Sequence, residues 1–94
     1  MNGLSLDVTI TAADGLLSCD LSGETAILHL KSGIYFTMNP LATKVWSLIQ
    51  EPHSIRSVHN TILECYDVDE ETAAHDLLAL LAEMREHDLI VVKA

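Results

Sequence analysis

Residues 32–49, SGIYFTMNPLATKVWSLI, decide the fold of this chain, because their hydrophobic period changes at Asn39 and Pro40. Before that point the side chains follow the two-residue period of a strand. After it, Leu41 and Val45 begin a run of apolar residues at helical spacing. Asn39 can accept a hydrogen bond from a first-turn amide, and Pro40 suits the first helical position because its missing N–H is not needed there. The stretch therefore predicts a strand that leads directly into a capped helix.

The length and composition predict a single small domain. The chain has 94 residues, enough to bury a modest core, and 49% of them are hydrophobic, which argues against disorder. No apolar run approaches the roughly 20 residues of a membrane-spanning helix, and the first residues lack the basic start and apolar block of a signal peptide. We therefore expect residues 1–94 to form one cytoplasmic domain that does not enter a membrane.

The charge balance limits the class of partner. The chain has 5 Lys and Arg residues against 14 Asp and Glu residues, which gives a formal net charge of −9. A surface of this sign repels a phosphate backbone, so we expect no nucleic-acid partner. A basic peptide or a basic patch on another protein suits the charge better, although an acidic surface can also serve solubility alone.

The cysteine and histidine residues show no pattern of a catalytic or metal site. Cys19 and Cys65 are far apart in apolar surroundings, so we expect buried free thiols rather than a disulfide. The five histidines lack ligand spacing, and His59 and Cys65 fall on opposed sides of a predicted helix. A glycine-rich phosphate loop is also missing. We therefore expect surface histidines and a binding protein without metal, cofactor or enzymatic activity.

The N-terminal third predicts an antiparallel sheet. Strand-like runs at residues 16–20, 25–30 and 34–38 are separated by turn residues and predict a three-stranded meander. Residues 6–10 alternate in the same way before a turn at residues 13–15. We expect residues 1–15 to form a loosely attached N-terminal strand or arm.

The rest of the chain predicts three helices. The first runs from about residue 40 to residue 50 and is stopped by Pro52, and Ser54 and Asp69 are candidate caps for the second and third. Residues 89–92 are expected to be extended and packed against a helix or the sheet. The fold class is therefore α+β and winged-helix-like, with a three-stranded antiparallel meander followed by three helices.

Four motifs follow one another along the strands and helices: Gly33, Tyr35, Phe36, Met38 and Asn39; Ala42, Val45, Trp46 and Leu48; Ile62, Tyr66, Asp67, Val68 and Asp69; and Asp76, Leu77, Leu80, Leu81, Met84, Arg85, Leu89 and Ile90. No single motif is specific, but their order and spacing together are. In that order and spacing the chain resembles the PqqD-like family, small winged-helix-type domains that recognise leader peptides of ribosomally made, later modified peptides. The resemblance covers about residues 16–92, and the usual glycine between the first two helices is replaced here by residues 50–53, QEPH.

Within this family, the pair Tyr35 and Phe36 and the single-domain length look most like the leader-binding proteins of lasso-peptide pathways. The resemblance implies a non-catalytic protein of antibiotic biosynthesis that binds a precursor leader peptide. It also implies two partner enzymes, a leader-removing cysteine protease and an ATP-dependent macrolactam-forming cyclase. A PqqD-like chaperone for a radical-enzyme pathway remains an alternative.

The resemblance further implies that the leader adds as an extra strand beside residues 34–38, in a groove between that strand and the third helix. Residues 33–38 carry no charge, as suits an edge left open for pairing, although the strand could instead be central or covered. We expect Met38 in the core, Phe36 and Ile34 toward the third helix, and Tyr35 on the surface for a partner enzyme.

A helical wheel of the third helix predicts a core stripe of four residues, Ala73, Leu77, Leu80 and Met84. The apolar surface extends beyond this stripe to a flank that we predict as the groove wall: Ala74, Leu78, Leu81 and Arg85. Leu78 could equally pack on the second helix or in a dimer contact. The predicted peptide-binding residues are Gly33, Ile34, Tyr35, Phe36, Thr37, Ala74, Leu77, Leu78, Leu81 and Arg85.

Two other classes share this architecture. A winged-helix DNA-binding regulator would read DNA with the second helix, but Arg56, His59 and Asn60 give that helix few cations. A structural dimer could form through the third helix or by swapping residues 6–10. We therefore expect a monomer or a weak or strand-swapped dimer.

Overall fold

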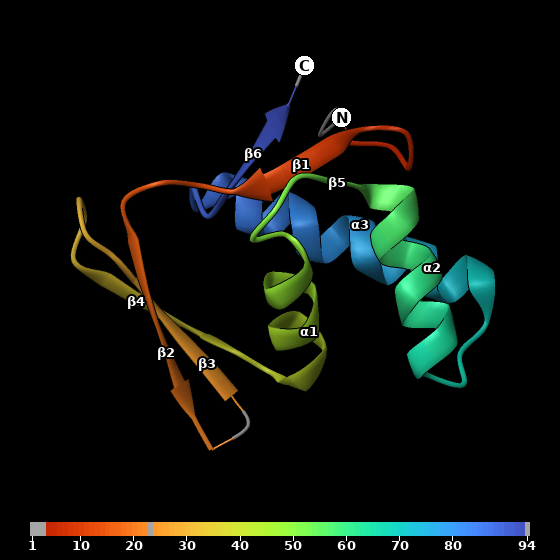
Figure 1. The fold of residues 1–94 in the computed structure, drawn as a ribbon, viewed down its shortest axis with the longest axis horizontal. Helices are drawn as coiled ribbons and strands as arrows, with labels where there is room; N and C mark the ends of the chain where they lie inside the picture. Colours follow the sequence, from red (N-terminus) through yellow and green to blue (C-terminus); the bar gives the residue numbers. More distant parts are fainter. Residues whose placement is uncertain (1–3, 23, 94) are drawn as a thin grey trace.

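The computed structural model describes residues 4–22 and 24–93, and in these ranges it shows an α+β fold of two small antiparallel sheets and three helices (Figure 1). None of the helices in these ranges is long and apolar enough to cross a membrane. The elements are β1 (Thr9–Ala12), β2 (Leu16–Leu21), β3 (Glu24–His29), β4 (Ile34–Met38), α1 (Pro40–Leu48), β5 (His53–Ser54), α2 (Ile55–Cys65), α3 (Glu70–Glu86) and β6 (Ile90–Lys93).

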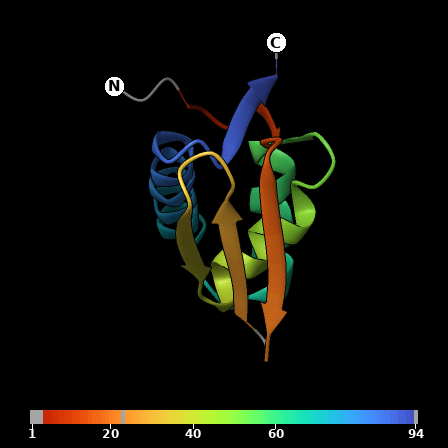
Figure 2. The same ribbon diagram turned by 90° about the vertical axis from the view of Figure 1, so that its left-hand side faces the viewer.

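The predicted three-stranded meander is confirmed, with the strand order β2-β3-β4 and antiparallel pairing throughout. The register pairs Leu21 with Glu24, and Ser22, directly after β2, has a positive φ of 51°, which tight hairpin turns favour. Gly33 enters β4 with a φ of 74°, a conformation that suits glycine. Figure 2 shows the meander in front and the helices behind it, so one face of this sheet is covered and the other is open.

The predicted caps are present at all three described helices. Asn39 Oδ1 accepts a hydrogen bond from the N–H of Ala42 at 2.8 Å, and Pro40 begins α1. Ser54 and Asp69 cap α2 and α3 in the same way, each through the N–H three residues later, at 3.1 and 3.0 Å. The switch from β4 to α1 is therefore as the sequence predicts.

The N-terminal segment differs from the predicted loose arm. β1 pairs antiparallel with β6 on one side and with β5 on the other, forming a second sheet of order β5-β1-β6. Ile10 is fully buried, and Val8 C=O accepts a hydrogen bond from Ile55 N–H. The alternating apolar side chains fix this strand because they pack into the core and its backbone pairs on both sides. Of the predicted arm, residues 1–3 lie outside the described part of the chain.

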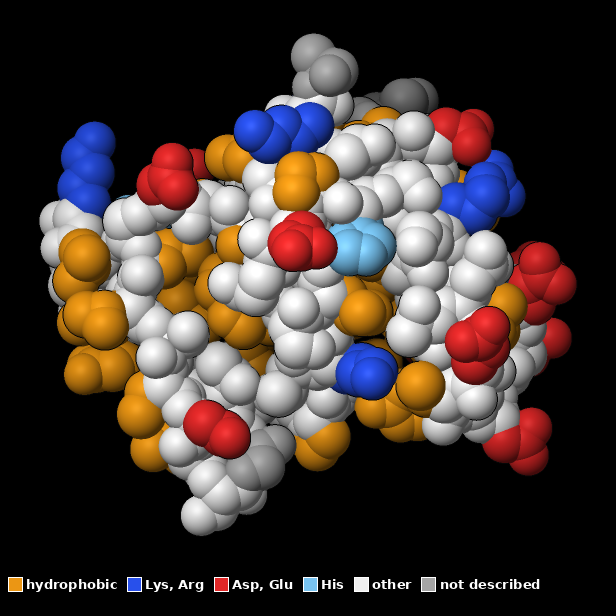
Figure 3. Space-filling model, in the orientation of Figure 1, with side chains coloured by type: hydrophobic (Ala, Val, Ile, Leu, Met, Phe, Trp, Pro, Cys, Tyr) orange, Lys and Arg blue, Asp and Glu red, His pale blue; other side chains and the backbone are white. Residues whose placement is uncertain are grey.

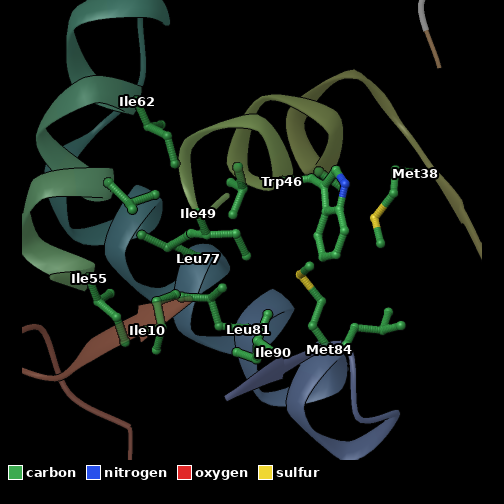
Figure 4. Packing of buried hydrophobic residues seen from close by; sticks show 14 of the residues in the cluster. Ile10, Met38, Trp46, Ile49, Ile55, Ile62, Leu77, Leu81, Met84 and Ile90 are labelled. Atoms are coloured by element: carbon green, nitrogen blue, oxygen red, sulfur yellow. The ribbon is translucent and has the colours of Figure 1, made fainter. Parts of the chain in front are cut away.

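The second sheet also changes which side of α3 is buried. Leu81 is fully buried, although we predicted it in a groove wall, and Leu80 is half-buried, although we predicted it in the core. Figure 4 shows Leu81 on the side of α3 near Ile90, and Trp46 beside Met84. Because β1 and β6 cover the flank that a single sheet would leave open, the core stripe is rotated. The buried residues of α3 are Ala73, Leu77, Leu81 and Met84.

Two expectations about polar and sulfur-containing side chains are wrong. Cys19 and Cys65 are free thiols but exposed, since Cys19 lies on the open face of the meander and Cys65 ends α2. His59 is buried, and its Nε2 lies 3.1 Å from the backbone oxygen of Glu70, so it ties α2 to the start of α3. Within residues 4–22 and 24–93, no three side chains gather as candidate metal ligands.

Candidate peptide-binding groove

The site begins at an open strand edge. In the described part of the chain, β4 pairs with β3 alone. The N–H of Leu30 bonds to Gly15 C=O on the β2 side, so the neighbouring His29 directs its backbone groups toward β4. Because hydrogen-bonded pairs alternate along antiparallel strands, the N–H and C=O groups of Tyr35 and Thr37 then point away from β3. β4 thus presents backbone donors and acceptors from two residues to an added strand.

A cavity of about 220 Å³ lies beside this edge, between β4 and the C-terminal half of α3. Phe36 directs its side chain toward it and lies with its ring centroid 4.9 Å from that of His87. Met38 closes the cavity toward the core and is buried, as predicted. The complete lining is Phe36, Thr37, Met38, Asn39, Ala42, Leu80, Glu83, Met84, His87 and Leu89.

Two of the predicted site residues on β4 lie at the cavity. Phe36 and Thr37 line the cavity, and Gly33 precedes the same strand. Tyr35 is 69% exposed on the opposite face, as predicted. Ile34 shares a face with Phe36 but lies beyond the cavity and is 54% exposed.

The helix half of the predicted site does not line this cavity. Ala74 lines a different hollow, beside Leu6, and Leu77 and Leu81 are buried in the core. Leu78 is half-buried and packs against the core, and Arg85 is exposed but does not line the cavity. None of these five residues lines the cavity beside β4.

The helix wall of the groove consists instead of residues that the sequence reasoning missed: Leu80, Glu83, Met84 and His87. The local signal for them is weak: residues 9–12, TITA, and 90–93, IVVK, are rich in β-branched residues and suit strands, but nothing in them shows that the two runs pair in a second sheet. Once one flank of α3 is assigned to that sheet, the opposite flank remains for the groove.

The groove combines apolar and polar side chains and holds one carboxylate. Glu83 is exposed at the rim and makes no ion pair within residues 4–22 and 24–93. Phe36, Leu80 and Met84 supply the apolar surface. Such a site suits an extended peptide with an apolar side chain over the cavity and a cationic or donor group near Glu83.

The outer face of the meander is apolar as well as open. The registers place Leu17, Leu28 and Tyr35 in one row across the sheet, and Leu17 is 56% exposed. Figure 3 shows hydrophobic side chains gathered on the left, over this sheet, and acidic side chains on the right, around α2 and α3. We name the row of Leu17, Leu28 and Tyr35 the outer patch. Contiguous apolar surface of this kind is typical of protein contacts.

The second helix, α2, with which a winged-helix regulator would contact DNA, offers few cationic side chains for a phosphate backbone. Arg56 on α2 is engaged by Asp7, with Nη2 and Oδ1 2.9 Å apart. His59 is buried, and Glu64 adds negative charge. The structure gives the regulator alternative no cationic face on this helix.

Comparison with known proteins identifies relatives of this arrangement. The sequence model of the family described as coenzyme PQQ synthesis protein D (PqqD) matches residues 24–90. No curated protein sequence gives a significant match.

Two solved structures have the same fold. The structure of TbiB1 in complex with the TbiA(beta) leader peptide is 27% identical in sequence, with a TM-score of 0.82, and the match covers 89% of this chain and 98% of that chain. The structure of lasso peptide synthetase B1 complexed with the leader peptide is 20% identical, with a TM-score of 0.78, over 87% of this chain and 96% of that chain.

Proposed function

The chain belongs to the PqqD family, and from that premise we propose that it binds the leader of a precursor peptide in lasso-peptide biosynthesis, without catalysing a reaction itself. The single observation that carries the proposal is the open, uncharged edge of β4 beside the cavity under Phe36. The 27% identity to TbiB1, whose structure contains a leader peptide, supports the same reading.

We infer the binding mode of the leader from the pairing of β4 and from the cavity beside it. An antiparallel leader strand would exchange backbone hydrogen bonds with Tyr35 and Thr37. The leader residue opposite Phe36 would share its face and enter the cavity between Leu80 and Met84. Its two neighbours would point to the opposite face, beside the outer patch. Backbone bonds would supply affinity for any extended peptide, and the cavity would select the side chain.

Delivery to two partner enzymes is the second part of the proposal. We propose that a leader-removing cysteine protease and a macrolactam-forming cyclase act on the bound precursor. Because the leader is held by this protein while the protein contacts the enzyme, the effective concentration of the precursor at the active site is raised. The outer patch is the contact surface that we assign to a partner enzyme, because it is exposed, apolar and next to the bound strand.

The test is binding of a fluorescein-labelled leader of the precursor encoded beside this gene, measured by fluorescence anisotropy. Thr37→Pro removes one outward N–H without removing a bond to β3, so it should weaken binding by roughly tenfold or more. Thr9→Ala, on the other sheet, is the matched control. No binding to the wild-type chain would refute leader recognition, and undiminished binding to Thr37→Pro would refute strand addition.

A further inference from the structure

The meander has a second open edge, at β2. Within the described residues β2 pairs with β3 alone, and residues 17–21 are exposed. Its register with β3 is continuous and therefore free of bulges, and the strand contains no Lys or Pro. These are the devices by which proteins usually block unwanted pairing at an edge. Asp20 is the only charge in the strand.

We propose that two copies of the chain associate through their β2 strands, antiparallel, with Cys19 of each copy on the two-fold axis. This inference is independent of the proposed function, because it uses the edge of the meander opposite to β4.

The faces of the strand restrict the register of such a pair. Residues directly opposite each other in an antiparallel pair must lie on the same face of the sheet. Leu17, Cys19 and Leu21 lie on the outer face, and Ser18 and Asp20 lie on the inner face. A register centred on Cys19 satisfies this condition. It sets Leu17 opposite Leu21 of the second copy, and Ser18 opposite Asp20.

The backbone supports the same register. The bond from Leu30 N–H to Gly15 C=O fixes the alternation along β2, so Leu17, Cys19 and Leu21 bond to β3 while Ser18 and Asp20 point outward. In the proposed pair, Ser18 and Asp20 of one copy exchange N–H···O bonds with Asp20 and Ser18 of the other. The Cys19 pair is then a non-hydrogen-bonded pair, whose Cα atoms are about 4.5 Å apart. A disulfide can span that distance.

The side chains are also complementary. Leu17 and Leu21, which are 56% and 54% exposed in one copy, would cover each other on the outer face. On the inner face, the hydroxyl of Ser18 can donate to the carboxylate of Asp20. No carboxylate stands opposite another, which matters because each copy has a net charge of −9. The contact is small, so the dimer should be weak and stronger at high salt, where the charges are screened.

The dimer would leave the leader sites open. Joining two meanders at β2 gives a continuous six-stranded sheet in which the two β4 edges lie at the opposite ends. Each copy could then bind its own leader peptide.

The first test uses cysteine cross-linking. Cys65 is also exposed, so the experiment uses Cys65→Ser as the background. Diamide, which takes two hydrogens from two thiols, should join two copies through Cys19 at high protein concentration. The matched variant Cys19→Ser in the same background should give none. Ser18→Pro in that background removes outward N–H groups while sparing the pairing with β3, and should lower the cross-linking yield by roughly tenfold or more.

Sedimentation equilibrium up to about 1 mM protein, at low and high salt, gives the second measurement. The wild-type chain should show a dimer, and Cys19→Lys, a change at an exposed position, should abolish it by placing two like charges on the axis. A wild-type chain that stays monomeric at high salt, or cross-linking that Ser18→Pro does not reduce, would overturn the proposal. Ser18→Pro should keep leader binding and Thr37→Pro should keep the dimer, so the two proposals fail separately.

Discussion

The ring of Phe36 on β4 lies 4.9 Å from the imidazole ring of His87, just beyond α3, with the two planes tilted by 45°. This contact joins the strand to the helix across one end of the groove. Phe36 is half-buried, so part of its surface remains available to a ligand.

Phe36→Ala should weaken leader binding by about 10- to 100-fold, because an aromatic side chain at the centre of a small interface carries much of the binding free energy. Tyr35→Ala, next in the strand but on the opposite face, should change the affinity little. Anisotropy titrations of the labelled leader measure both. Equal losses for the two variants would contradict the assigned faces.

Leu80→Glu and Ala74→Glu distinguish the groove of the structure from the groove predicted by the helical wheel. Leu80 lines the cavity, so a carboxylate at this position should reduce leader affinity at least about tenfold, because it must lose its hydration when the leader covers it. Ala74 lies in a different hollow, so its variant should bind normally. Circular dichroism should show that both variants are folded. If Ala74→Glu then loses leader affinity and Leu80→Glu keeps it, the leader binds at the flank that the helical wheel predicts.

Tyr35→Asp should slow leader removal by the partner protease while leaving the affinity for the leader within about twofold, because its side chain belongs to the outer patch. Val91→Asp, an exposed apolar residue on the other sheet, serves as the control and should be processed normally. Cleavage rates followed by mass spectrometry decide the matter. If Tyr35→Asp is processed at the wild-type rate, the outer patch does not contact the protease.

Ile10→Ala should lower the free energy of unfolding by about 2–5 kcal/mol, because it removes a fully buried side chain from the packed core. A detached N-terminal arm would instead predict almost no effect. Leu17→Ala, at an exposed position, should stay within about 0.5 kcal/mol of the wild type. Urea titrations followed by circular dichroism give both values.

Asn39→Ala should destabilise the domain by about 1 kcal/mol through loss of the α1 cap, in which Asn39 Oδ1 accepts the N–H of Ala42. The cap also fixes the end of β4, so leader affinity should fall slightly as well. Urea denaturation measures the first effect. A stability equal to that of the wild type would show that water replaces the cap without cost.

The local features of the fold could be predicted from the sequence. Asn39, Ser54 and Asp69 act through amides three residues away, and the pairing of β2 with β3 begins between Leu21 and Glu24, which are only three residues apart. These interactions are short-range, so composition and spacing determine them. The meander and the three helices follow from such features.

The groove wall could not be predicted, because it depends on a pairing between distant segments. β1 and β6 are strands of four residues each, and nothing local shows that Ile10 pairs with Val92. Their sheet covers one flank of α3 and buries Leu81, which shifts the open flank to Leu80. The rotation of a helix about its axis is set by everything packed on it, whereas a helical wheel gives only relative positions.

The pairing of β1 with β6 also has a consequence for synthesis on the ribosome. Thr9 is made early and its partner Lys93 about eighty residues later, so the second sheet cannot close while translation is still within α3. Until then Ile10 and Leu81 are without the cover that Ile90 provides. The groove beside Phe36 is complete only after His87 and Leu89, which line it, have left the exit tunnel, and a nascent chain should not capture a leader before that moment.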